Sequence, residues 1–286
     1  MNKTNKYTFS GHESFPCKAL WLKKGFDFVV DGNKWSSPNS VVKLGVGKNM
    51  VASIRFWMKA FNLVENDNLT SIANLLLNDE NGFDPYLEDL GTLWLLHYLL
   101  VSTGEATLYN LFFTRFQRER TLFERQQVVA LVKRCMTEDN KLKGYNENTV
   151  KKDVAVLLQN YLRPYKSMSM EDYSALLIDL DLIRQTSDNK MFTFNIEGKA
   201  QLPLDILLYA ILQEKGTDNT VDYDTLQTVG LMFCLTDMEL IDMLMSLQAK
   251  YPQILRYTDT AGLRQVQLLH NITPYDVLNN YYNEKL

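Results

Sequence analysis

The stretch from Val41 to Val64 constrains the fold most, because its pattern predicts two helices joined by a tight turn. Apolar residues recur in its second half at i, i+1, i+4, i+7, i+8 and i+11, which is one continuous face of an α-helix. They are Met50, Val51, Ile54, Trp57, Met58 and Phe61. Gly45 and Gly47 lie in the turn before this helix and can take positive φ at low cost. The pattern therefore predicts a helix-turn-helix whose second helix has one buried face.

The opposite face of this second helix is cationic. It carries Lys48, Arg55 and Lys59, and no acid occurs between Asp31 and Glu65. Cations opposite an apolar face also occur on ordinary solvated helices, but such a long acid-free stretch favours a polyanionic partner. We expect a recognition helix for double-stranded DNA, in which cations contact phosphates and polar residues of the first turns read bases. The expected DNA-binding residues here are Lys43, Lys48, Asn49, Ser53, Arg55 and Lys59.

A short hairpin is expected after this helix. Leu63-Val64 and Leu69-Thr70 flank a polar turn at residues 66–68, and a hairpin after a helix-turn-helix is the order of a winged helix. Glu65 and Asp67 make the tip acidic, so we expect this wing to be a poor phosphate clamp that faces away from DNA.

Two further segments show a similar outline. In residues 83–200, Asp84-Pro85 predicts the start of a buried central helix, and Thr121 with Glu124 predicts a capping box. A later helix in this segment carries Lys151 and Lys152 opposite an apolar side, so both lysines join the expected DNA-binding residues. In residues 201–286 we expect three helices, the last capped by Thr236 and Glu239, and then a hairpin around residues 259–262.

The predicted fold class is mainly α with small β-hairpins, arranged as tandem winged helix-turn-helix-like units around a helical middle region. We expect three domains. Residues 1–82 form an N-terminal winged-helix unit, residues 83–200 a helical middle with a second winged-helix-like unit, and residues 201–286 a C-terminal winged-helix-like unit.

The net charge of −4 conceals an alternation along the chain. Residues 1–62 hold ten Lys or Arg and three Asp or Glu, a net of +7, and residues 115–166 hold twelve and six, a net of +6. Residues 63–114 hold none and eight, a net of −8, and residues 167–286 hold eight and seventeen, a net of −9. Local fields of this kind decide partners more than the total does. An adaptor that docks a basic protein through its acidic surfaces is therefore the alternative to a DNA-binding protein.

The sequence shows no sign of a membrane protein or a disulfide framework. No apolar run reaches the length of about 18 residues that a membrane span needs, and the N-terminus lacks the apolar run of a signal peptide. The three cysteines are odd in number and far apart along the chain. We expect a soluble cytoplasmic protein with buried thiols, and a homodimer is left open.

No arrangement of a nucleophile and a base stands out, so we expect a protein that is not an enzyme and uses no cofactor or metal. His12 and Glu13 near Cys17 are possible metal ligands, but a hydrogen-bonded arm explains them as well. Asp84, Glu88 and Asp89 suit a helix start without any metal. A metal-dependent hydrolase that uses these histidine and carboxylate residues is the third hypothesis.

Several strings resemble one known family. They are Phe9-Ser-Gly-His-Glu-Ser-Phe-Pro16, Trp21-Leu-Lys-Lys-Gly25, Leu44-Gly-Val-Gly-Lys-Asn-Met-Val51, Asp84-Pro-Tyr-Leu-Glu-Asp89 and Thr92-Leu-Trp-Leu-Leu-His97. They resemble the bacterial domain-of-unknown-function family 4007, whose members are encoded in phage-defence islands, often beside proteins of DNA sulfur modification (phosphorothioation). The resemblance implies a protein partner and a role in DNA modification or antiviral defence, with no catalytic residue to carry over. We therefore expect a non-catalytic DNA-binding subunit or regulator of such a system.

Overall fold

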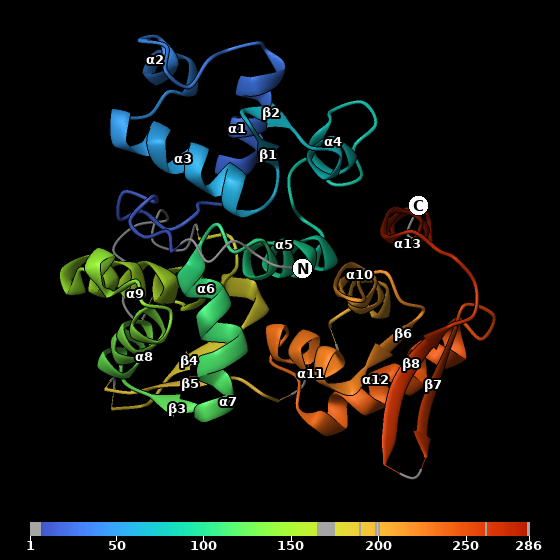
Figure 1. Ribbon diagram of the computed structural model, residues 1–286. Coiled ribbons are helices and arrows are strands. Elements are labelled where there is room, and N and C mark those ends of the chain that lie inside the picture. Colours follow the sequence, from blue (N-terminus) through green and yellow to red (C-terminus); the bar gives the residue numbers. More distant parts are fainter. Residues whose placement is uncertain are drawn as a thin grey trace. The chain divides into compact units, whose positions relative to one another are not determined.

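The computed structural model describes residues 7–164, 175–188, 190–197, 199, 201–260 and 262–284. The chain falls into two compact units, one of residues 3–195 and one built on residues 196–286 (Figure 1). Of the residues that the structure describes, 54% are in helices and 11% in strands, and the sheets are small and antiparallel. This confirms a mainly α protein with small hairpins. The assignment as tandem winged helix-turn-helix units and the division into three domains stay predictions.

The first unit begins with three helices and a hairpin in the expected order. They are α1 (Trp21–Val30), α2 (Ser40–Leu44), α3 (Lys48–Ala60), β1 (Val64–Glu65) and β2 (Asn68–Leu69). Gly45 ends α2 in the left-handed conformation with φ 65°, as expected, because only a residue without Cβ takes this conformation freely. Gly47 has φ −68° and is the N-cap of α3, so of the two glycines in this turn only Gly45 takes positive φ.

The hairpin turns the chain through two residues with positive φ, Asn66 at 50° and Asp67 at 63°. A two-residue turn with both φ positive matches the twist of the paired strands. Thr70 then caps α4 (Ser71–Leu77) by accepting the backbone N–H of Ala73.

Helix α5 (Leu90–Thr103) is buried from Gly91 to Ser102, which confirms the central buried helix. It begins later than predicted. Its N-cap is Asp89 and not Asp84, because Asp84 accepts the backbone N–H groups of Glu88 and Asp89, and Leu87 takes φ 59°. Residues 84–89 therefore form a loop.

An aromatic core follows α5. The chain continues through α6 (Thr107–Leu111), the π-helix η1 (Phe112–Phe116) and α7 (Gln117–Glu119). The rings of Phe112, Phe113, Phe116, Phe123 and Phe194 lie within 4.6–6.4 Å of at least one other ring of this group.

A three-stranded sheet closes the first unit in the order β3 (Leu122–Phe123), β5 (Phe192–Phe194), β4 (Ile183–Gln185). The capping box lies at Glu124 and Gln127 and opens α8 (Arg125–Glu138), so the box predicted at Thr121 and Glu124 was wrong: Leu122 and Phe123 pair with β5 instead. After η2 (Leu142–Gly144) comes α9 (Glu147–Tyr161). The sequence also predicts a helix near residues 170–180; the first part of this range lies outside the described residues, and η4 (Ile178–Leu180) in its last part is a 3-10 turn.

The second unit matches its expected outline. It contains α10 (Leu204–Glu214), β6 (Thr220–Asp222), α11 (Tyr223–Met232), α12 (Asp237–Lys250), β7 (Leu255–Thr260), β8 (Leu263–Leu268) and α13 (Pro274–Asn283). Thr236 and Glu239 form the expected capping box of α12. Strand β6, which pairs with β8, and helix α13 were not expected. Among the described residues, no helix combines the length and apolarity that crossing a bilayer requires.

Candidate nucleic-acid interface

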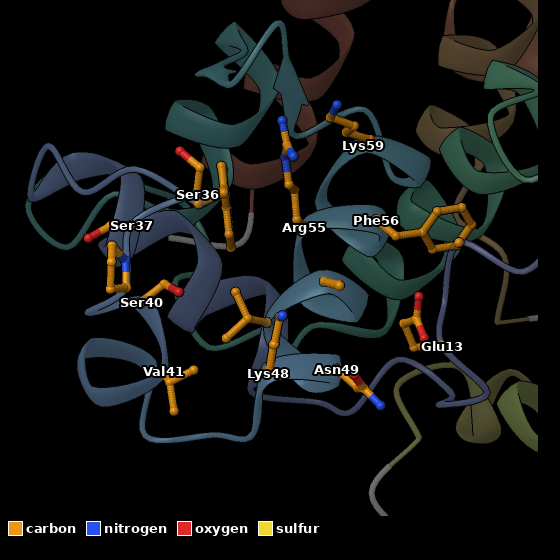
Figure 2. A pocket seen from close by; sticks show the side chains of 15 residues that line it. Glu13, Ser36, Ser37, Ser40, Val41, Lys48, Asn49, Arg55, Phe56 and Lys59 are labelled. Atoms are coloured by element: carbon orange, nitrogen blue, oxygen red, sulfur yellow. The ribbon is translucent and has the colours of Figure 1, made fainter.

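The outward side of α3 lines an open cavity of about 710 Å³, which we call the α3 trough. Three segments line it: the N-terminal arm, the segment from Trp35 to Val41, and α3 itself. In Figure 2 the labelled residues of the Trp35–Val41 segment and Glu13 of the arm lie on opposite sides of Lys48 and Arg55. The lining residues are Gly11, Glu13, Trp35, Ser36, Ser37, Pro38, Ser40, Val41, Lys48, Asn49, Val51, Ala52, Arg55, Phe56 and Lys59.

Four of the expected DNA-binding residues come together in this trough: Lys48, Asn49, Arg55 and Lys59. Lys48 and Asn49 are exposed in the first turn of α3, and no side chain caps that helix start. Within the described part of the chain, Lys48 has no ion-pair partner. The N-terminal N–H groups and the Lys48 ammonium both favour an anion at this end of the trough.

The wing tip pairs with the cations of α3. Arg55 Nη2 lies 2.6 Å from Asp67 Oδ2, and its Nε donates to Oδ1 at 3.0 Å. Lys59 Nζ lies 4.0 Å from the same carboxylate. The two-residue turn at Asn66-Asp67 brings Asp67 back over α3, and the expectation that the acidic wing faces away from DNA stays a prediction. The Arg55 and Asp67 side chains are 41% and 46% exposed, so their pair contributes only about 0–1 kcal/mol.

Ser53 cannot make the base contact predicted for it. It is fully buried, and its hydroxyl has no hydrogen-bond partner among the described residues. Helix α3 packs against α1, α2, α5 and β1, so it buries more of its circumference than a single apolar stripe indicates.

The remaining expected residues lie elsewhere. Lys43 is exposed on α2 but does not line the trough, and neither Lys151 nor Lys152 of α9 lines it. Lys151 Nζ lies 2.6 Å from Glu147 Oε1, and this hydrogen-bonded pair holds the pKa of Glu147 below its ordinary value. The structure therefore does not bring the α9 cations into the site.

A buried contact between His12 and Asp153 lies where the arm is held beside the trough. His12 is 3% exposed; its Nδ1 accepts the Ser14 N–H, and its Nε2 lies 3.1 Å from Asp153 Oδ1 without hydrogen-bond geometry. Both Asp153 oxygens accept the Ser10 N–H, at 3.2 and 3.0 Å. These contacts anchor the arm to Asp153 of α9. Sequence reasoning missed Asp153 because nothing in the local pattern links residues 141 positions apart.

Gly11 and Trp35 were also missed. A Cβ on Gly11 would meet Phe56 Cδ2 at 2.3 Å, so the arm approaches α3 this closely only because residue 11 is glycine. Trp35 packs on Phe28 with ring centroids 4.7 Å apart and forms part of the trough lining.

The acids of the hydrolase hypothesis are engaged in local structure. Asp84 accepts two backbone N–H groups, and Asp89 caps α5 by accepting the Thr92 N–H. Among the described residues, no group of three or more His, Cys, Asp or Glu is placed to hold a metal ion. The three cysteines are buried and free, and burial raises the pKa of the Cys234 thiol to about 12.

Comparisons with known proteins agree with this architecture. A family model described as "Protein of unknown function (DUF4007)" matches residues 9–282. A structure described as a magnesium ion-bound SspB crystal structure is 25% identical, with a TM-score of 0.81, over 97% of this chain and 88% of that chain. A second SspB crystal structure is 26% identical, with a TM-score of 0.79 and the same coverage. No curated protein matches the chain.

Proposed function

The chain belongs to the DUF4007 family, and from this premise we propose that it is a DNA-binding subunit or regulator of a bacterial DNA-modification or phage-defence system that contacts DNA through the α3 trough. One observation carries the proposal: Lys48, Arg55 and Lys59 line one open cavity together with Asn49, on a helix that has no acid.

The charge balance of the trough suits a phosphate backbone. Three cations face two carboxylates, Glu13 in the lining and Asp67 on the wing. Because the Arg55–Asp67 pair is half exposed and contributes little, a phosphate can replace Asp67 at the guanidinium without a large cost. The guanidinium also offers the planar donor pair that suits phosphate oxygens.

The context supports the same role. The resemblance to family 4007 implies a place in defence islands and DNA sulfur modification, and the likeness to SspB supports a shared architecture over 97% of the chain. A protein partner in such a complex follows from the same context. Whether the chain forms a homodimer, and whether it is cytoplasmic, stay predictions.

Binding to a labelled duplex at two salt concentrations tests the proposal. Lys48→Glu with Arg55→Glu should weaken binding at least about tenfold and flatten the salt dependence, because two phosphate contacts are lost. Lys24→Glu with Arg256→Glu makes the same charge change on exposed residues outside the trough and should leave affinity within about threefold. Equal losses in both variants, with unchanged circular dichroism, would contradict a site in the trough.

An adaptor role is the second candidate, and one observation favours it. On α12 the side chains of Met238 and Met245 are 77% and 58% exposed, with the exposed acids Asp237 and Asp242 on the same helix. Exposed methionines are common at adaptable protein-binding surfaces. Co-purification of a partner that survives nuclease treatment and the Lys48/Arg55 double substitution would support the adaptor.

We also propose that the chain has no chemistry of its own. One SspB structure is described as magnesium-bound, but the described residues here hold no three-ligand group that fits such an ion, so we derive no step through it. Supercoiled plasmid incubated with the protein and Mg²⁺ should stay supercoiled. Appearance of nicked or linear plasmid, absent from a mock preparation, would refute this part of the proposal.

A further inference from the structure

We infer that the α3 trough takes an unpaired nucleotide, either in a single strand or turned out of a duplex, and does not place α3 in the major groove. This inference rests on the proposed DNA binding and specifies the form of DNA that the site accepts.

The first argument is shape. A recognition helix reads bases by standing out from its domain, since the major groove is about 8.5 Å deep. Here Lys48 and Arg55 of α3 lie between Glu13 of the arm and the labelled residues of the Trp35–Val41 segment (Figure 2). Because both segments flank this side of α3, the helix face accommodates a ligand between them and does not project into a DNA groove. The cavity of about 710 Å³ falls within the roughly 300–1,000 Å³ of small-ligand sites.

The second argument is the chemistry of the lining. Trp35, Pro38, Val41, Val51, Ala52 and Phe56 give the trough apolar surface, and Lys48, Arg55 and Lys59 add positive charge. Aromatic rings beside cations are how proteins hold unpaired nucleotides, because every base has a π-face and every nucleotide a phosphate. The Phe56 ring is only partly buried, and its edge contacts with His12 and Trp57 fix its orientation. An intact duplex exposes only the edges of its bases in the grooves, so it offers these rings no π-face to stack on.

The third argument is an unused donor. Trp35 is 8% exposed, and its indole Nε1 is buried without a hydrogen-bond partner among the described residues. A buried N–H left unpaired costs about 1–3 kcal/mol, so such groups call for an explanation. Since Trp35 lies in the trough lining, an oxygen of a bound base or phosphate can supply the missing acceptor. The hydroxyls of Ser36, Ser37 and Ser40 lie in the same wall.

Binding to three fluorescent DNAs of equal length tests the inference: a single strand, an intact duplex, and a duplex with one unpaired 2-aminopurine nucleotide. We expect the two DNAs with an unpaired base to bind about 5- to 100-fold tighter than the intact duplex, the range for stacking one base. We also expect 2-aminopurine fluorescence to fall on binding, because the base stacks on a ring.

Substitutions separate the inference from the proposed function. Trp35→Phe removes the donor and keeps a ring, and Phe56→Leu removes a ring that is partly exposed; each should bring the unpaired forms toward the duplex affinity. Tyr86→Leu, at a 61% exposed aromatic outside the lining, is the control and should change nothing. Unfolding midpoints confirm folding, and if Trp35→Phe does not fold, Phe56→Leu alone decides.

Two outcomes overturn different claims. Equal affinity for all three DNAs, with no effect of either ring substitution but a loss with Lys48→Glu and Arg55→Glu, would overturn the inference and leave DNA binding intact. No binding to any of the three DNAs would overturn the proposed function, and the inference with it.

Discussion

At the residue scale, the carboxylate of Asp67 controls how much positive charge the trough presents. Asp67 takes a bidentate contact from Arg55 and lies near Lys59, while Lys48 at the other end has no such partner in the described chain. The three cations were predictable from helical spacing. Their partner was not, because its position depends on the two positive φ values of the hairpin turn.

Asp67→Asn should therefore strengthen DNA binding several-fold and steepen its salt dependence, since two cations lose their carboxylate. Stability should change by less than about 1 kcal/mol because the pair is half exposed. Glu65→Gln is the matched control on the same hairpin and should have a smaller effect. If both substitutions raise the affinity for DNA equally, the affinity depends on net charge and not on the contact of Asp67 with Arg55.

Asp153 should matter for stability, because its loss removes the acceptor of the Ser10 N–H and the carboxylate that lies beside the buried Nε2 of His12. We expect Asp153→Ala to lower the free energy of unfolding by about 2–4 kcal/mol. Proteolytic cleavage in the arm should also become faster. The exposed Asp179→Ala should cost less than about 1 kcal/mol in urea denaturation. Similar values for both variants would mean that the arm is not anchored through Asp153.

At the element scale, helices with strong local signals were predictable and loops were not. Helix α12 begins at its Thr236–Glu239 capping box as expected, because both partners of the box are three residues apart. The start of α5 and the capping box before α8 were misplaced, because Asp84 binds backbone N–H groups of a loop and Leu122 pairs with a distant strand. The walls of the trough were not predictable either, because the arm and α3 meet only through tertiary contacts.

A polar cluster ties three elements of the second unit. Asp205 of α10 is buried and accepts from Lys250 at the end of α12, at 2.8 Å, and from Tyr251; Lys250 also lies 3.0 Å from Glu284, just after α13. Burial and the Asp205 hydrogen bond raise the pKa of Tyr251 to about 12. Burial alone would lower the pKa of Lys250, but its hydrogen bonds to Asp205 and Glu284 raise it overall.

Lys250 and Tyr251 stay protonated to a higher pH in the folded chain than in the unfolded chain. The stability that they contribute is therefore complete below about pH 10 and is lost as the pH rises toward 12. Urea denaturation followed by circular dichroism should show stability falling over this window. Tyr251→Phe should reduce the fall, with Tyr275→Phe, at a 38% exposed tyrosine, as control. A fall of unchanged size in Tyr251→Phe would show that the cluster is not responsible.

At the scale of the whole molecule, the fold treats the two basic stretches of the chain differently. In the basic stretch of residues 115–166, Arg115 and Arg134 pair with Glu119 and Glu138, and Lys151 pairs with Glu147. The basic stretch of residues 1–62 keeps Lys48 unpaired within the described chain. Counting charges along the sequence therefore identified two candidate basic stretches, and the fold distinguishes them because only residues of the first stretch line the α3 trough.

Lysine footprinting tests the central claim most directly, because it reads contact with DNA in the protein of unchanged sequence. The protein is acetylated briefly with and without saturating DNA, and each lysine is quantified by mass spectrometry. The account predicts that DNA slows acetylation of Lys48 and Lys59 several-fold and leaves Lys24, exposed outside the trough, unchanged. Equal acetylation of Lys48 in the free and DNA-bound protein would contradict a DNA site in the α3 trough.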